Sequence, residues 1–206
     1  AAIERGVHVL VEKPIAETVE EAQTLVDAAA RHGVTLAVGH IERCNPAVVE
    51  LKRLLDAGEL GRTFMLHSRR LSPFPARIMD VGVAADLATH EVDMMRYLTG
   101  AEVAHVSSSV SRVIHPTHED LIVSLLRFDN GVLGVLDVNW VTPTKIRDIH
   151  VTGERGMFTV NYLTQELCFF ANAAAGESFA RSEWPPTDAF SIAEGPMVRH
   201  HIAKRE

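Results

Sequence analysis

The sequence predicts an α/β plus α+β protein, in which a short segment of parallel sheet precedes a mostly antiparallel open sheet with helices on one face. Near the N-terminus, apolar runs flank an amphipathic helix in the order strand, helix, strand, with short links, as in parallel sheets. From Val103 onward, strand-like runs are separated by turn sequences. That pattern is typical of strands linked by hairpins.

The N-terminal elements form one βαβ unit. Residues 7–11 are mainly β-branched and apolar like a buried strand, and residues 34–38 form the next strand. Between them a helix begins at Thr18, carries two glutamates in its first turn where the helix dipole favours acids, and ends at Gly33. This unit is too small to be a domain by itself.

Three elements connect this unit to the antiparallel sheet. A helix is predicted from Pro46 to about Ala57, followed by a strand over residues 62–71. A third helix covers residues 83–99 and ends at Gly100.

The antiparallel sheet is predicted from apolar runs and the turns between them. The strands cover residues 103–113, 121–128, 132–139, 145–152 and 157–162. Asp129-Asn130-Gly131 is the strongest hairpin signal. From Ala171 on, the chain is rich in Ala, Ser, Pro and Gly, and no element is predicted there.

The composition indicates an ordinary globular protein and argues against several function classes. Of the 206 residues 47% are hydrophobic, and 27 acidic residues outnumber 20 basic ones, for a formal net charge of −7. No basic run is present, which argues against nucleic acid as a partner, and no apolar run approaches the ~20 residues that span a bilayer. The two cysteines lie far apart without metal-type spacing, which favours a reducing, cytoplasmic location.

The first candidate site motif is Glu12-Lys13-Pro14, directly after the first predicted strand. In open parallel sheets, ligands bind beyond the carboxyl ends of the strands. Pro14 restricts Lys13 to extended conformations, so the ammonium group has a defined direction, and the Lys13–Pro14 bond can be cis or trans. The alternative is a Glu-Lys pair that only solvates the end of a strand.

A second candidate motif runs from Gly39 to Pro46, after the next parallel strand. His40, Glu42 and Arg43 are expected to line the same cleft as Lys13. Asn45 is a natural N-cap for the helix that Pro46 opens. We interpret Cys44 as a small packing residue.

The third candidate motif lies on the third predicted helix. Asp86, His90 and Asp93 have i, i+4 and i+7 spacing, which places them on one helical face. A carboxylate one turn from an imidazole can raise the pKa of the histidine and set its tautomer, as in general acid–base catalysis. The alternatives are a solvated polar stripe, and a metal site made of Asp and His ligands.

Taken in order, these motifs resemble the Gfo/Idh/MocA family of oxidoreductases, and within it the branch that acts on nucleotide sugars, such as UDP-N-acetylglucosamine 3-dehydrogenases. The resemblance runs from Gly6 to about Tyr162, and Cys44 departs from it because an aromatic residue is common there. It rests on the segments Val9-Leu10-Val11-Glu12-Lys13-Pro14, Gly39-His40, Asn45-Pro46-Ala47, Gly58-Glu59-Leu60-Gly61 and Gly82 to Asp93.

The resemblance implies a division into two domains. Residues 1–40 would be the C-terminal remnant of a dinucleotide-binding Rossmann domain, and residues 41–206 an α+β domain for substrate binding and oligomerisation with an incomplete C-terminus. No Gly-x-Gly-x-x-Gly fingerprint occurs in the chain, so we expect it upstream, together with the residue that selects NAD or NADP. The fragment alone is then expected to be inactive.

The resemblance also implies an activity and a set of site residues. The activity would be hydride transfer between a secondary hydroxyl of a sugar, nucleotide sugar or polyol and NAD or NADP, in a homo-oligomer assembled through the open sheet. No metal ligand is implied. The catalytic residues would be Lys13, Asp86 and His90; the cofactor-binding residues Glu12, Lys13, His40 and Arg43; and the substrate-binding residues Lys13, Asn45, Asp86 and His90.

Two other functions are compatible with the residues alone. One is a metal-dependent hydrolase or lyase that uses Asp86, His90 and Asp93 as ligands. The other is a non-catalytic assembly module in which the sheet only builds an oligomer.

Overall fold

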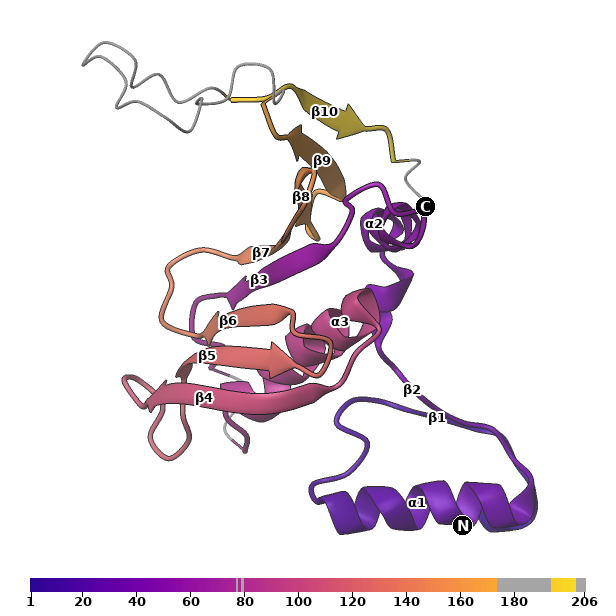
Figure 1. Cartoon of the computed structure of the whole chain (residues 1–206). Helices are drawn as coiled ribbons and strands as arrows, with labels where there is room; N and C mark the ends of the chain where they lie inside the picture. The colour runs from indigo at the N-terminus through magenta and orange to yellow at the C-terminus, as the bar shows by residue number, and fades with distance from the viewer. Residues whose placement is uncertain (77, 79, 174–193, 203–206) are drawn as a thin grey trace, which may run out of the picture.

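The computed structural model describes residues 1–76, 78, 80–173 and 194–202. It contains a small N-terminal unit with α1 (Val19–His32) and a large curved sheet with two helices against it (Figure 1). The prediction of an α/β segment followed by an open-sheet α+β domain is therefore confirmed.

The N-terminal unit is the predicted βαβ unit. β1 (Val9–Val11) pairs in parallel with β2 (Leu36–Val38), and the chain crosses between them through α1. Thr18 caps α1 through a capping box with Glu21, which satisfies free amides of the first turn. A short 3₁₀-helix, η1 (Ile3–Arg5), precedes β1. Both strands are shorter than the apolar runs that predict them.

The large sheet has eight strands in the order β10-β9-β8-β7-β3-β6-β5-β4. All neighbouring strands are antiparallel except β3 and β6, which are parallel. The strands are β3 (Thr63–Leu71), β4 (Val103–Ser111), β5 (Leu121–Phe128), β6 (Leu133–Asn139), β7 (Ile146–Gly153), β8 (Gly156–Asn161), β9 (Glu166–Ala171) and β10 (Met197–His200).

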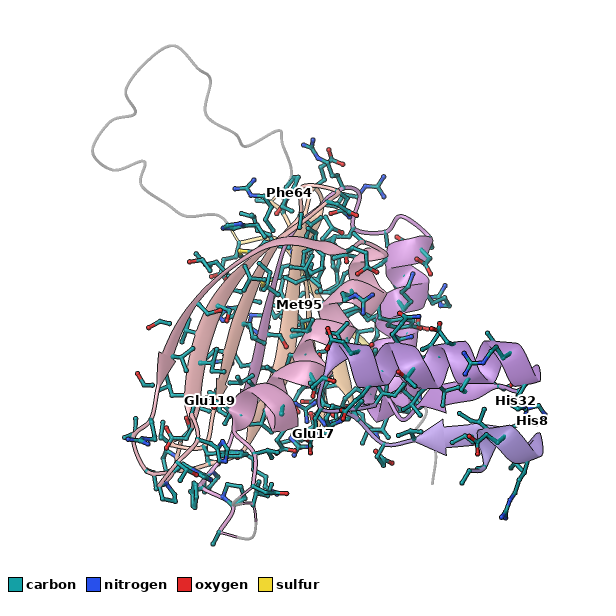
Figure 2. All side chains as sticks on the ribbon, turned by 90° about the horizontal axis from the view of Figure 1, so that it is seen from below. His8, Glu17, His32, Phe64, Met95 and Glu119 are labelled. Carbon is teal, nitrogen blue, oxygen red and sulfur yellow. The ribbon has the colours of Figure 1, made fainter. Side chains whose placement is uncertain are left out.

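Helices cover one face of this sheet and form the core with it. Leu51 on α2 (Pro46–Asp56) and Met94 and Met95 on α3 (Thr89–Thr99) are fully buried. Figure 2 shows Met95 on the helix side of the sheet. Alternate residues of the strands point away from the helices, so the other face of the sheet is open.

Two short helical segments differ from the predicted elements. The predicted helix over residues 83–99 begins instead with a π-helix, η3 (Ala84–Ala88), which contains Asp86. A 3₁₀-helix, η2 (Ile41–Cys44), precedes α2. Single π-turns inside helices occur frequently at functional sites.

The turn predictions were more accurate than the predictions for the C-terminal part. The Asp129-Asn130-Gly131 hairpin is confirmed, with Gly131 at φ 85°, a value that favours glycine. β9 and β10 were not predicted. Much of the unassigned tail, residues 174–193 and 203–206, lies outside the described residues. None of the helices within the described ranges is long and apolar enough to cross a membrane.

Candidate active site

Lys13 and Asp86 meet between the N-terminal unit and the large domain. Lys13 Nζ donates to Asp86 Oδ1 at 2.8 Å and to the Asp86 backbone carbonyl at 2.5 Å. The two side chains are only 14% and 24% exposed. The Lys13–Pro14 peptide bond is cis. An ammonium group from the end of β1 is thus fixed against the π-turn that opens α3.

His90 lies one turn beyond Asp86, at the start of α3 and partly buried. Burial is the main reason that its pKa falls to about 4, and the positive charges of Arg70 and Lys13 lower it further. Asp86 acts to raise the pKa of His90, as expected, but its effect is smaller than the lowering effects, so the net shift is downward. His90 is neutral at pH 7 and can accept a proton.

Glu12 lies at the junction of the two parallel strands. Its side-chain oxygen would be 3.1 Å from a Cβ at Gly39, the first residue after β2. A side chain at position 39 would therefore force the Glu12 carboxylate to move. The backbone of Gly39 and the Glu12 carboxylate share the carboxyl edge of the small sheet, where open α/β sheets bind ligands.

Arg43 and His40 both face Asp93. Arg43 forms a two-point ion pair with Asp93, with distances of 2.9 Å from Nε and 2.5 Å from Nη2, and its guanidinium also lies over the Tyr97 ring. His40 Nδ1 is 3.5 Å from Asp93 Oδ2, but this contact does not satisfy hydrogen-bond geometry, and the buried atom has no hydrogen-bond partner among the described residues. We therefore regard it as a long electrostatic contact rather than a hydrogen bond.

Asn45 and Cys44 have simpler surroundings. Asn45 caps α2 by accepting from Ala47 N–H, and its amide donates to the Tyr162 carbonyl at 3.1 Å. Both ends of its side chain are thus used within the chain. The interpretation of Cys44 as a packing residue is wrong, because Cys44 is exposed. It is the last residue of η2, which turns it outward.

A buried ionic cluster lies behind the site and was not predicted. Arg70 of β3 donates to Glu42 of η2 at 2.6 Å and to Glu91 of α3. Glu91 also accepts from the Ser68 hydroxyl. Burial raises the pKa of Glu91, although Arg70 and Ser68 act in the opposite direction. The cluster ties η2, β3 and α3 together directly beside His90.

The sequence contained a signal for this cluster. Leu66, Ser68 and Arg70 occupy every second position of one predicted strand, so they lie on the same face. A core-facing leucine therefore shares its face with an arginine. A buried arginine requires carboxylate partners. The partners themselves are 28 and 21 residues away in sequence and could not be identified from local patterns.

The surroundings of Asp86 and Asp93 do not favour a metal site. Asp86 binds Lys13 and Asp93 binds Arg43, so both proposed carboxylate ligands already contact cations. Among the described residues, no group of three or more His, Cys, Asp or Glu side chains is arranged to hold a metal ion.

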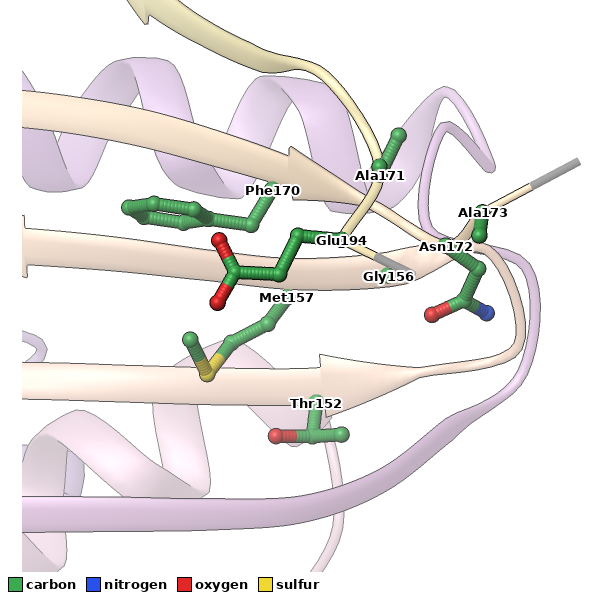
Figure 3. A pocket seen from close by; sticks show the side chains of 9 residues that line it. Thr152, Gly156, Met157, Phe170, Ala171, Asn172, Ala173 and Glu194 are labelled. Carbon is green, nitrogen blue, oxygen red and sulfur yellow. The ribbon is translucent and has the colours of Figure 1, made fainter. Parts of the chain in front are cut away.

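A depression of about 360 Å³ lies elsewhere, on the open face of the sheet (Figure 3). Thr152, Met157 and Phe170 line it from neighbouring strands, and their side chains alternate with core residues such as Val151 and Phe158. It is therefore on the opposite face of the sheet from Arg70 and is not part of the candidate site.

Comparison with known proteins places the chain in a family. Residues 48–159 match the GFO/IDH/MocA C-terminal domain, and residues 1–40 match the oxidoreductase family with an NAD-binding Rossmann fold. The chain belongs to the Gfo/Idh/MocA family. The resemblance inferred from the motifs is thereby confirmed.

Individual Gfo/Idh/MocA proteins are similar over much of the chain. UDP-N-acetylglucosamine 3-dehydrogenase of Acidithiobacillus ferrooxidans is 31% identical over 173 residues, which cover 84% of this chain and 54% of that protein. Inositol 2-dehydrogenase 2 of Saccharopolyspora erythraea is 35% identical over 138 residues, covering 65% and 41%. The chain thus spans about half the length of the curated relatives it matches.

Solved structures show the same fold. A structure of the A. ferrooxidans enzyme has a TM-score of 0.82 and 27% identity, covering 100% of this chain and 60% of that chain. Levoglucosan dehydrogenase, solved in complex with NADH and L-sorbose, has a TM-score of 0.75 and 27% identity, covering 82% and 52%.

Proposed function

We propose that the full-length protein containing this chain is an NAD(P)-dependent dehydrogenase that oxidises a secondary hydroxyl of a sugar, nucleotide sugar or polyol. The observation that carries this proposal is the fixed Lys13–Asp86 pair with a neutral His90 one turn away. Family membership supports it, and relatives named as dehydrogenases of inositol and of UDP-N-acetylglucosamine support the substrate class.

The residues fit a nicotinamide cofactor at the carboxyl edge of β1 and β2. His40 Nδ1 is buried there and has no hydrogen-bond partner in the part of the chain that the structure describes, and Glu12 and Lys13 follow β1 directly. We propose that Glu12, Lys13 and His40 contact the cofactor. Arg43 is also proposed to contact the cofactor, through donors other than the Nε and Nη2 groups that bind Asp93. When bound, the cofactor accepts the hydride of the alcohol carbon.

Three side chains carry out proton transfer and charge stabilisation in the proposed oxidation. His90, neutral at pH 7, takes the hydroxyl proton. Lys13 donates a hydrogen bond to the substrate oxygen and stabilises its developing negative charge. Asp86 holds Lys13 in place through the 2.8 Å contact, and its negative charge favours the imidazolium formed on His90.

Substitution of His90 and Lys13 in the full-length enzyme tests the mechanism. His90→Ala should lower kcat by about 10²–10⁴-fold, the usual contribution of a general base, while the affinity for NADH changes little. Lys13→Met should lower kcat similarly. His32→Ala, at the exposed end of α1, is the matched control. Wild-type turnover in His90→Ala would remove His90 from the mechanism.

We also propose that the open face of the sheet joins copies of this protein. Exposed apolar side chains on that face come from five strands: Met65, Val123, Leu125, Leu133, Phe170 and Met197. Exposed apolar side chains gathered on one face of a sheet are typical of an interface. Light scattering on Leu125→Glu should show smaller particles than the wild type, and an unchanged mass would refute this interface.

We further propose a cytoplasmic location. Cys44 and Cys168 are both free thiols, as expected in a reducing compartment. Fractionation of the source cells would test the location, and recovery outside the cytoplasm would contradict it.

A further inference from the structure

Arg147 lies at the start of β7, beside the buried ionic cluster. In the antiparallel pair of β3 and β7 it is directly opposite Arg70, so both side chains point to the same face of the sheet. Ile149 and Val151 occupy every second position after Arg147 in β7 and therefore share its face of the sheet. Both are fully buried under the helices. The Arg147 side chain therefore points to the helix-covered face that also carries the candidate site.

Among the described residues, Arg147 differs from Arg70 and Arg43 in having no hydrogen-bond or ion-pair partner for its side chain. Arg70 donates to two carboxylates and Arg43 to one. Within the described ranges the Arg147 side chain makes no hydrogen bond or ion pair, although it is partly buried. Partial burial of a cation without a partner is costly, so this guanidinium is well suited to bind an anionic group.

Pairing across β3 and β7 places Arg147 next to Arg70 and thus beside the buried cluster behind the candidate site. Burial and the charge of Arg70 lower its pKa, and the carboxylates of Glu42, Glu91 and Asp86 act in the opposite direction. Arg147 and the proposed reacting groups therefore share the helix-covered face of the sheet, with the Arg70 cluster next to both. Its five donors form a planar fork that matches a carboxylate or phosphate group.

We propose that Arg147 is a specificity-determining residue that binds an anionic group on the substrate. The substrate is then an acidic sugar derivative, carrying either a carboxylate or a phosphate, rather than a neutral polyol. This inference rests on the proposed dehydrogenase function and narrows its substrate class. Arg147 anchors the substrate at a distance from the reacting hydroxyl and takes no part in hydride or proton transfer.

Steady-state kinetics of the full-length enzyme test the proposal. The substrates are myo-inositol and glucose as neutral compounds, glucuronate as a carboxylate, and glucose 1-phosphate and UDP-N-acetylglucosamine as phosphates. The wild type should prefer one of the acidic classes. Arg147→Gln should lower kcat/KM for that class by about 10- to 100-fold, mainly through KM, because a charge-assisted two-point contact is lost.

Two further variants separate recognition from folding and from general charge effects. Arg147→Lys keeps the charge but loses the fork, so it should recover only part of the lost kcat/KM. Lys145→Gln removes an exposed positive charge two residues away and should change kcat/KM less than twofold. Thermal unfolding of each variant checks that the fold is retained, and Arg147→Lys replaces Arg147→Gln if the latter unfolds.

The outcomes separate this inference from the proposed function. The role of Arg147 would be overturned if the wild type oxidised neutral polyols as well as every acidic compound, or if Arg147→Gln and Lys145→Gln had equal kinetics. Either result would leave the proposed dehydrogenase function unaffected. If the wild type oxidises none of the compounds, the proposed function fails. Calorimetric titration with glucuronate and UDP-N-acetylglucosamine then tests the anion site by itself. Binding to the wild type that Arg147→Gln abolishes would support the site, and no binding to the wild type would overturn it.

Discussion

Replacing Arg70 with methionine should destabilise the fold strongly, because one guanidinium serves two buried carboxylates. Arg70 is 3% exposed, and Glu42 and Glu91 are 8% and 0% exposed. Removing one partner of a buried ion pair costs about 3–5 kcal/mol. Typical domains unfold at about 5–15 kcal/mol, so Arg70→Met should lose a large part of the stability of this domain.

The loss should depend on pH, with a sign fixed by Glu91. The pKa of Glu91 is already raised by burial, and Arg70 is the main factor that lowers it. Without Arg70 the folded protein holds the Glu91 proton at higher pH, whereas the unfolded chain releases it near pH 4.5. Stability contributed by a group with a raised pKa is present at low pH and is lost as pH rises. Both proteins therefore lose stability as the pH rises above 4.5, and the variant should go on losing up to about 1.4 kcal/mol per pH unit between the wild-type pKa of Glu91 and its own higher one.

Urea unfolding of the full-length protein at pH 5 and pH 8, followed by circular dichroism, measures both effects. Arg53→Met is the matched control, since Arg53 pairs with Glu50 on the exposed side of α2 and an exposed pair contributes little. A loss below about 1 kcal/mol in Arg70→Met, or the same loss at both pH values, would refute the account of the buried cluster.

Three further predictions concern the site and the sheet. Because the pKa of His90 is lowered to about 4, kcat/KM for alcohol oxidation should stay level from pH 7 down to about pH 5 and fall below that as the imidazole is protonated; a decline centred near pH 6.5 would contradict this assignment. Gly156→Ala should lower stability by at least about 2 kcal/mol in urea unfolding, because a Cβ would lie 2.1 Å from a carbonyl oxygen of β9 at φ 151°, whereas Gly131→Ala meets open space and should lose clearly less. Asp93→Asn should weaken its two-point pair with Arg43 and reduce stability by about 1–3 kcal/mol; an unchanged urea midpoint would show that the pair is dispensable.

The contact between Lys13 and Asp86 could be predicted from the sequence. Each residue stands in a motif whose place in the fold is set by local signals: the end of a parallel strand for Lys13, and the start of a helix for Asp86. The family resemblance joined the two motifs into one site. Neither signal, however, indicated the π-turn around Asp86, because the residue pattern there also fits a regular α-helix.

The protonation state of His90 could not be predicted from its neighbours in sequence. Asp86 is one turn away and favours a raised pKa, but burial, Arg70 and Lys13 together have the larger effect. Two of these three causes come from packing between distant segments. Local spacing therefore predicted the raising effect of Asp86 but not the net direction of the pKa shift of His90.

The edges of the sheet were also hard to predict. β10 has only four residues, and its pairing with β9 joins segments separated by more than twenty residues that are rich in Ala, Ser, Pro and Gly. Short edge strands depend on the partner strand more than on their own composition. The central strands were found because each alternates apolar and polar residues between clear turns.

The contact between Lys13 and Asp86 also bears on how such proteins tolerate recombination. One residue of the pair belongs to the βαβ unit and the other to the open-sheet domain, so neither half carries the constellation alone. A chimera that exchanges the first forty residues with those of a relative would keep this contact only if both parents have the same ammonium and carboxylate groups at corresponding positions. A crossover at this junction must therefore preserve the Lys13–Asp86 contact as well as the continuity of the backbone.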